Sequence, residues 1–147
     1  MLTNKALSIW RFPVTEYRPE EKQLESLTLA DDADLLKGRL IARFSYKSAE
    51  QPVTSWVEMY QKVLQILFEE DKTIITKLAV SKEEGLAMHF GLTENAFAKC
   101  VEIGDDIYVW TNNNTQTKLS VLNRLFAMYN VDLMDLEFFL RDENEVT

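Results

Sequence analysis

The amino-acid sequence predicts a single domain of the α+β class, and three observations lead to this prediction. The chain has 147 residues, the size of one ordinary domain. It contains only four glycines and three prolines, so tight turns are few and long regular elements are favoured. Segments of period two occur together with segments of helical period. We therefore expect a small mixed or antiparallel sheet of about five strands packed against three to four helices.

The predicted domain, residues 1–147, has three parts. Residues 1–34 form an N-terminal segment and an acidic arm, in which Pro19 is a favoured first position of a short helix. The apolar patch at residues 9–12 is expected to dock on the core. Residues 35–140 contain the α+β core, and residues 141–147 are expected to fray.

The first predicted strand covers residues 38–47, where polar and apolar side chains alternate. One face holds Leu40, Ala42, Phe44 and Tyr46. The other face holds Arg39, Ile41, Arg43, Ser45 and Lys47. A turn at Ser48–Gln51 and a short strand at Pro52–Thr54 complete a predicted hairpin, with Pro52 restricted to its start or to a sheet edge.

A helix is predicted to begin after Ser55, because Ser55 and Glu58 have the spacing of a capping box. Six apolar residues follow at helical spacing as far as about Glu69. They are Trp56, Tyr60, Val63, Leu64, Leu67 and Phe68. Asp71 can cap a second helix, and Ser81 begins a weaker capping box for a short third one.

Two β-rich runs, Ala98–Ile103 and Ile107–Thr111, predict a hairpin around Gly104-Asp105-Asp106. In the second run Ile107 and Val109 point one way, while Tyr108 and Trp110 point the other way. Both faces are apolar, so this strand is either central or lines a binding surface. Of the two we favour burial of Trp110.

The last long helix is predicted to follow the polar run Asn112–Thr115, with Asn114 or Thr115 as its N-cap. Its apolar stripe consists of Leu119, Leu122, Phe126 and Tyr129, widened by Leu125. Asn130 suits a left-handed C-cap, and residues 136–140 read as a closing strand.

Charge and cysteine content limit the possible functions. The formal net charge is −8, and more than half of the acidic residues lie in residues 16–34 and 132–145. This acidity weakens a nucleic-acid function without excluding it. The single cysteine, Cys100, excludes an internal disulfide, and no apolar run is long enough to span a membrane. We therefore expect a cytoplasmic protein.

Two stretches of the sequence carry a family resemblance. They are KGRLIARFSYKSAEQPVTSW, residues 37–56, and DDIYVWTNNNTQTKLSVLNRLFAMYNVDLMDLEFFL, residues 105–140. Over about residues 35–140 the chain resembles the C-terminal region of bacterial ParB/sulfiredoxin-like, GmrSD-type restriction proteins. The DGQQR-type motif and the histidine-rich nuclease motif of that family do not occur here. The resemblance therefore implies an accessory C-terminal module of a restriction or defence-related protein.

No catalytic or metal-binding motif is recognisable. His89, the single histidine, has no spacing that ties it to a nucleophile, and Cys100 lacks a CxxC partner. The cluster Asp31-Asp32-Ala33-Asp34 lacks the alternation, glycine and terminal glutamate of a calcium loop. We expect no catalytic residue, no metal and no cofactor.

The first candidate binding site is a basic face on the first predicted strand. Lys37, Arg39, Arg43 and Lys47 have the same parity along the chain, so they would lie on one side and attract phosphates. The alternative is that lysine and arginine protect an edge strand from pairing with other sheets.

The second candidate site is the segment around the second hairpin strand and the helix start, which could bind a partner or an anion. Aromatic rings can stack on bases or peptides, and a helix N-terminus can bind an anion. The residues are Tyr108, Trp110, Asn112, Asn113, Thr115 and Lys118. The alternative is a core aromatic pair next to an ordinary helix cap.

Three functions are compatible with these observations. The leading one is a non-catalytic binding or interaction module, whose partner is another protein or the remainder of a larger restriction-type protein. The second is direct nucleic-acid binding through the basic face. The third is an enzyme whose site is assembled from distant residues.

Overall fold

The computed structural model describes residues 24–81, 83–94 and 99–142. The predictions made for the apolar patch at residues 9–12 and for a helix near Pro19 lie outside these residues. So does most of the predicted frayed tail.

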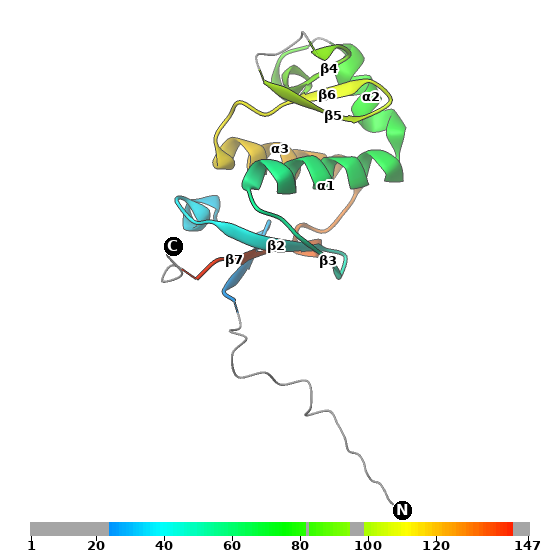
Figure 1. Ribbon diagram of the computed structural model, residues 1–147. Coiled ribbons are helices and arrows are strands. Elements are labelled where there is room, and N and C mark those ends of the chain that lie inside the picture. The colour runs from blue at the N-terminus through cyan, green and yellow to red at the C-terminus, as the bar shows by residue number, and fades with distance from the viewer. Residues whose placement is uncertain (1–23, 82, 95–98, 143–147) are drawn as a thin grey trace, which may run out of the picture.

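Two sheets lie on opposite sides of a layer of two long helices (Figure 1). The four-stranded sheet has the order β1-β7-β2-β3, and the three-stranded sheet has the order β4-β6-β5. The strands of the two sheets are β1 (Ser26–Thr28), β2 (Ile41–Tyr46), β3 (Ala49–Pro52), β4 (Phe90–Gly91), β5 (Cys100–Gly104), β6 (Ile107–Trp110) and β7 (Leu136–Leu140). The helices are α1 (Trp56–Glu70), α2 (Lys72–Ser81) and α3 (Thr115–Tyr129), with short 3₁₀ helices η2 (Ala33–Leu36), η3 (Gly85–His89) and η5 (Leu133–Asp135).

The α+β class, three helices and antiparallel pairing are confirmed, but the expectation of one sheet with about five strands is wrong in the number of sheets. Strand β2 and strand β6 each have a buried face, and these faces pack on opposite sides of the helix layer. The additional strands, β1 and β4, have three and two residues. Such lengths are too short to show a period of two in the sequence.

Strand β1 begins in the segment that was expected to be an acidic arm. It pairs with β7, placing Leu27 opposite Phe138, and Leu29 just after it is 5% exposed. The core therefore begins before residue 35, and residues 24–34 belong to the packed domain.

The alternation predicted for residues 38–47 is interrupted by a β-bulge. Ile41 pairs with Leu140 and Arg43 pairs with Phe139, so one extra residue of β2 lies between the two pairs. The bulge exchanges the two faces at this point. As a result Ile41 is buried at 1%, whereas Leu40, which was predicted to be buried, is 58% exposed.

The hairpin after β2 turns earlier than predicted. Lys47 and Ser48 have φ of 50° and 72°, which forms a tight two-residue turn, and β3 ends at Pro52 instead of beginning there. The edge position of β3 tolerates Pro52, as expected.

Helix α1 begins as the capping box predicts. The Ser55 hydroxyl accepts a hydrogen bond from the Glu58 N–H at 3.1 Å, as predicted. The Glu58 carboxylate accepts from the Thr54 N–H at 2.8 Å, one residue before the cap to which the capping box assigns this bond. Five of the six stripe residues are fully buried, and Trp56 is half-buried with its indole Nε1 donating to the Arg39 carbonyl at 2.9 Å.

Helix α3 has the predicted caps. Asn114 accepts from the Thr117 N–H at 2.8 Å, and Asn130 ends the helix with φ of 59°. Its stripe faces α1 and the four-stranded sheet, where the Phe126 ring meets the Tyr46 ring edge-on at 5.9 Å between centroids. Phe44, Tyr60, Phe126 and Phe138 are among the largest side chains that are completely buried.

Candidate functional site

The predicted basic face is occupied by ion pairs. Arg39 lies 2.9 Å from Glu25, Arg43 lies 3.2 Å from Glu50, and Lys47 lies 3.7 Å from Glu70. Arg43 also covers the Phe139 ring at 4.3 Å. Lys37 is exposed and forms no ion pair with a described residue. Three of the four cations therefore already have a neighbouring carboxylate. The edge-protection alternative is wrong as well, because β2 lies between β7 and β3 and is not an edge strand.

The second predicted site does not form one surface. Tyr108 and Trp110 lie on one face of β6 and are half-buried, opposite Ile107 and Val109, which are buried. We predicted that Trp110 is buried, whereas it is only half-buried in the structure. Its ring stacks on His89 with centroids 5.8 Å apart.

The polar loop between β6 and α3 is exposed at Asn112 and half-buried at Asn113 and Thr115. Asn114, between them, caps α3. The loop therefore has the helix-capping role that was the alternative to an anion site.

Lys118 points away from this surface and into the protein, where it is 3% exposed. Its ammonium donates to the Thr111 carbonyl at 3.1 Å, to the Asn113 carbonyl at 2.6 Å and to Asn113 Oδ1 at 2.8 Å. These three bonds use all its protons. Burial lowers the pKa of Lys118, and the side chain fixes the loop instead of receiving an external anion.

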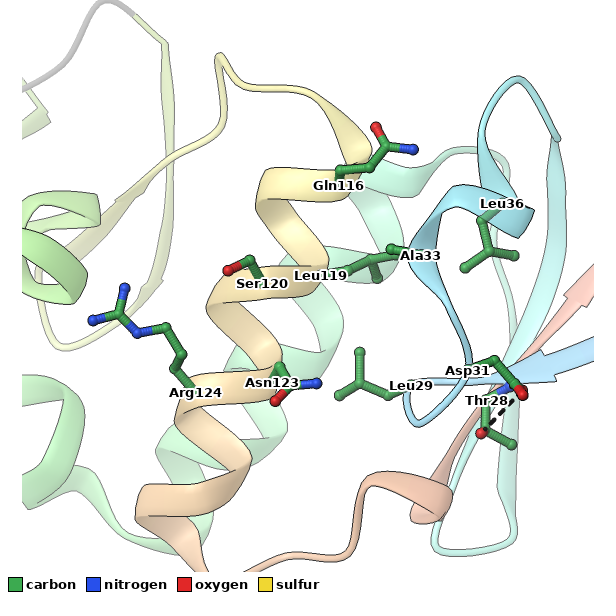
Figure 2. Close-up of a pocket in the computed structure, with 10 residues that line it drawn as sticks. All are labelled: Thr28, Leu29, Asp31, Ala33, Leu36, Gln116, Leu119, Ser120, Asn123 and Arg124. Carbon is green, nitrogen blue, oxygen red and sulfur yellow. Dashed lines mark hydrogen bonds between the residues drawn. The ribbon is translucent and has the colours of Figure 1, made fainter.

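The exposed side of α3 carries two hollows that the sequence did not reveal. We call the first the α3 pocket; it has a volume of about 260 Å³ and lies between α3 and the segment from β1 to η2 (Figure 2). We call the second the α2–α3 groove; it has a volume of about 440 Å³ and lies between α3 and the segment from α2 to η3. Arg124 contributes to the lining of both.

The α2–α3 groove is mainly apolar and has charges at its rim. The apolar lining consists of Leu78, Leu86, Ala87, Ala127 and Met128. Glu83 and Glu84 line the side formed by α2 and η3, and Arg124 lines the side formed by α3. Neither carboxylate is within ion-pair distance of Arg124, and Arg124 forms no hydrogen bond with the described residues.

A third hollow of about 480 Å³ lies beside α1. It is lined by Gln51, Lys62, Gln65, Ile66, Glu69 and Glu70. Glu70 already has a hydrogen-bond partner, because both its carboxylate oxygens accept from the Tyr46 hydroxyl, at 3.1 and 2.9 Å.

The described residues include His89, Cys100 and a number of aspartates and glutamates. Among them no three histidine, cysteine, aspartate or glutamate side chains are grouped so that they could hold a metal ion. His89 and Cys100 line none of the three hollows. Burial, with a smaller contribution from Arg124, lowers the pKa of His89, so its imidazole is neutral at pH 7. None of the described helices is both long and apolar enough to cross a membrane.

Comparison with known proteins gives no match, whether to protein-family models, to curated proteins or to solved structures. The likeness to restriction proteins therefore stays a prediction.

The signal that could have revealed the groove is faint. Ala127 and Met128 follow Arg124 by about one helical turn, and all three lie on the side of α3 opposite its apolar stripe. An isolated methionine on a polar helix face is normal in a soluble protein, so it does not indicate a site without the facing η3 segment.

Proposed function

We propose that the chain is a non-catalytic protein-interaction module and that the α2–α3 groove is its binding surface. The observation that supports this most is an apolar hollow beside a guanidinium group that has no hydrogen-bond or ion-pair partner among the described residues. An interface of this kind combines apolar contact with a charge that specifies the orientation of the partner.

The apolar part of the groove suits an inserted side chain. Leu86 and Ala87 are 7% and 6% exposed and form its base, while Met128 is 48% exposed at its side. Methionine side chains adapt to differently shaped partners because they are unbranched and flexible. The partner therefore inserts an apolar side chain between η3 and α3.

The charged part of the groove specifies the chemistry next to that side chain. Arg124 presents donors that match a carboxylate in a bidentate arrangement. Glu83 and Glu84 face it from the other side and favour a basic group. The partner segment thus carries an apolar anchor with an acidic group on the α3 side.

The resemblance over about residues 35–140 adds a candidate for the partner. If the chain is the accessory C-terminal module of a restriction-type protein, the partner is the remainder of that protein or a protein encoded beside it.

The test is co-elution of the purified chain with each protein encoded beside its gene. Complex formation should survive in Met134→Glu and be lost in Met128→Glu and Arg124→Glu. Met134 is the matched control because it is 67% exposed and lines none of the three hollows. Loss of an apolar anchor should weaken binding by about thirtyfold or more, corresponding to roughly 2 kcal/mol. Co-elution with none of these proteins, or equal binding by all three variants, would contradict the proposal.

The nucleic-acid hypothesis is tested with labelled DNA and RNA at low salt. The carboxylates beside Arg39, Arg43 and Lys47 reduce their attraction for phosphates. Binding that falls in Arg39→Ala and Arg43→Ala and decreases steeply with salt would make nucleic acid the ligand in place of protein.

A further inference from the structure

The α3 pocket has an apolar base between two side-chain amides. Leu29, Leu36 and Leu119 are 5%, 1% and 4% exposed and form the base. Figure 2 shows the amides of Gln116 and Asn123 on the side of α3 that faces this base, whereas Ser120 and Arg124 point to the other side of the helix. The pocket thus has an apolar centre and a polar group at each end.

Neither amide has a hydrogen-bond partner in the part of the chain that the structure describes. No hydrogen bond joins the side chain of Gln116 or Asn123 to another residue of the described chain, and Gln116 Nε2 is buried without an acceptor. Leaving a buried N–H unpaired is unfavourable, so it marks a position where an acceptor from outside is stabilising.

The spacing of the two amides matches an extended peptide. Gln116 and Asn123 are seven positions apart on α3, which is about 10 Å along the helix axis. Three residues of an extended chain also span about 10 Å. A primary amide has a donor and an acceptor side by side and can therefore bond to a peptide group through both. Between the two contacts the central side chain of the peptide would rest on the three leucines.

The rim on the opposite side is negative. Asp31 lines the pocket, and its carboxylate accepts from the Thr28 N–H at 2.7 Å. Asp32 and Asp34 follow it in the chain next to the pocket lining without belonging to it. None of the three forms an ion pair with a described residue. A peptide with basic side chains is therefore favoured over an acidic one.

We propose that the α3 pocket binds an extended, basic peptide segment of a partner protein and holds a short apolar residue of it between Gln116 and Asn123. This inference rests on the proposed function and gives it a second contact, on the other side of α3 from the groove.

The test is an NMR titration of the whole chain with capped tripeptides, observing the side-chain amide signals of Gln116 and Asn123. Lysine-valine-lysine should shift both signals. Glutamate-valine-glutamate and lysine-glycine-lysine should bind about tenfold more weakly, because they lack the charge or the apolar contact. Absence of shifts at millimolar peptide, or equal shifts with all three peptides, would overturn the inference.

Gln116→Met and Gln65→Met form the matched pair of variants. Gln116→Met removes an amide that has no partner among residues 24–81, 83–94 and 99–142, so the fold should persist. The lysine-valine-lysine affinity should fall about tenfold, the effect of one lost hydrogen bond. Gln65 lies in the hollow beside α1, and its replacement should leave the affinity unchanged. Equal affinities of the two variants would place the peptide elsewhere. Co-elution that depends on Met128 and persists without peptide binding would refute this inference alone.

Discussion

Lys118 shows how a single charged side chain can be structural at a position where the sequence suggests a ligand contact. Its ammonium is buried beneath the loop before α3 and lies 5.8 Å from the centre of the Tyr60 ring. No carboxylate of the described chain pairs with it, and three oxygens of the loop satisfy its protons instead. The residue therefore stabilises one loop conformation.

Replacing Lys118 by methionine should destabilise the fold by about 1–3 kcal/mol, because two loop carbonyls lose their donor. Urea denaturation measures this difference at pH 7.

The pH dependence of the stability difference between the wild type and Lys118→Met gives a second prediction. Burial lowers the pKa of Lys118 below its usual 10.5, so the folded protein releases this proton at lower pH than the unfolded chain. The wild type should therefore gain stability, relative to the variant, as the pH rises from the lowered pKa toward 10.5. A constant difference across that range would contradict the assignment.

Phe126 connects α3 to the four-stranded sheet, since it is completely buried and meets Tyr46 edge-on. Phe126→Ala should lower the free energy of unfolding by about 3–5 kcal/mol through lost burial and the cavity that remains. Thermal and urea denaturation measure this loss in the free energy of unfolding. Met128→Ala, two positions further along α3 and on its exposed face, is the control and should change stability by less than about 0.5 kcal/mol.

At this scale the sequence predicts which residues are apolar anchors, but it does not predict the bulge in β2. The bulge exposes Leu40 and buries Ile41, and so it also breaks the common parity on which the basic face depended. Such a shift depends on the pairing of β2 with β7, a partner about 95 positions away in the chain. Local alternation contains no information about it.

At the scale of the elements, caps and periods were reliable. The Ser55 capping box, the Asn130 end of α3 and the closing strand β7 were all visible in the sequence and are confirmed. The division of the strands between two sheets could not be predicted from the sequence. Alternation of polar and apolar residues predicts that one face of a strand is buried, but it does not predict which element covers that face. The two hollows on α3 depend on that layer arrangement, so they could not be predicted either.

The C-cap of α3 gives a prediction at this scale. Asn130 has a left-handed backbone, with φ of 59°, which costs most residues roughly 1–2 kcal/mol. Asn130→Ala should therefore destabilise the protein by about 1 kcal/mol, whereas Asn130→Gly should be neutral or slightly stabilising. Equal melting temperatures of the two variants would show that the backbone conformation at residue 130 differs from the one described.

The whole molecule is held together by a helix layer that both sheets share. Helix α1 contacts β2 on one side and β5 on the other, and it packs against α3 within the layer (Figure 1). Helix α2, which follows α1 directly, also contacts β4 and β6 of the three-stranded sheet. We therefore expect the two sheets to unfold together in one cooperative transition.

This prediction is checked with two single-tryptophan variants in which the other tryptophans are replaced by phenylalanine. Trp56 reports on the four-stranded sheet, where its ring lies 5.3 Å from that of Phe138, and Trp110 reports on β6. Their fluorescence should follow the same urea curve as the far-UV circular dichroism of the same variant. A fluorescence midpoint that differs from the circular-dichroism midpoint of the same variant would mean that the sheets are independent units.

The position of β7 has a consequence for the time order of folding. This last strand lies between β1 and β2, and it pairs Phe139 with Ser26 on one side and Phe138 with Phe44 on the other. During synthesis the two earlier strands leave the ribosome with no strand between them. The four-stranded sheet cannot close until β7 has left the ribosome, and contacts of such long sequence separation form slowly. Until that moment the edge of β2 that pairs with β7 is open, so this is the stage at which the protein is most prone to aggregate.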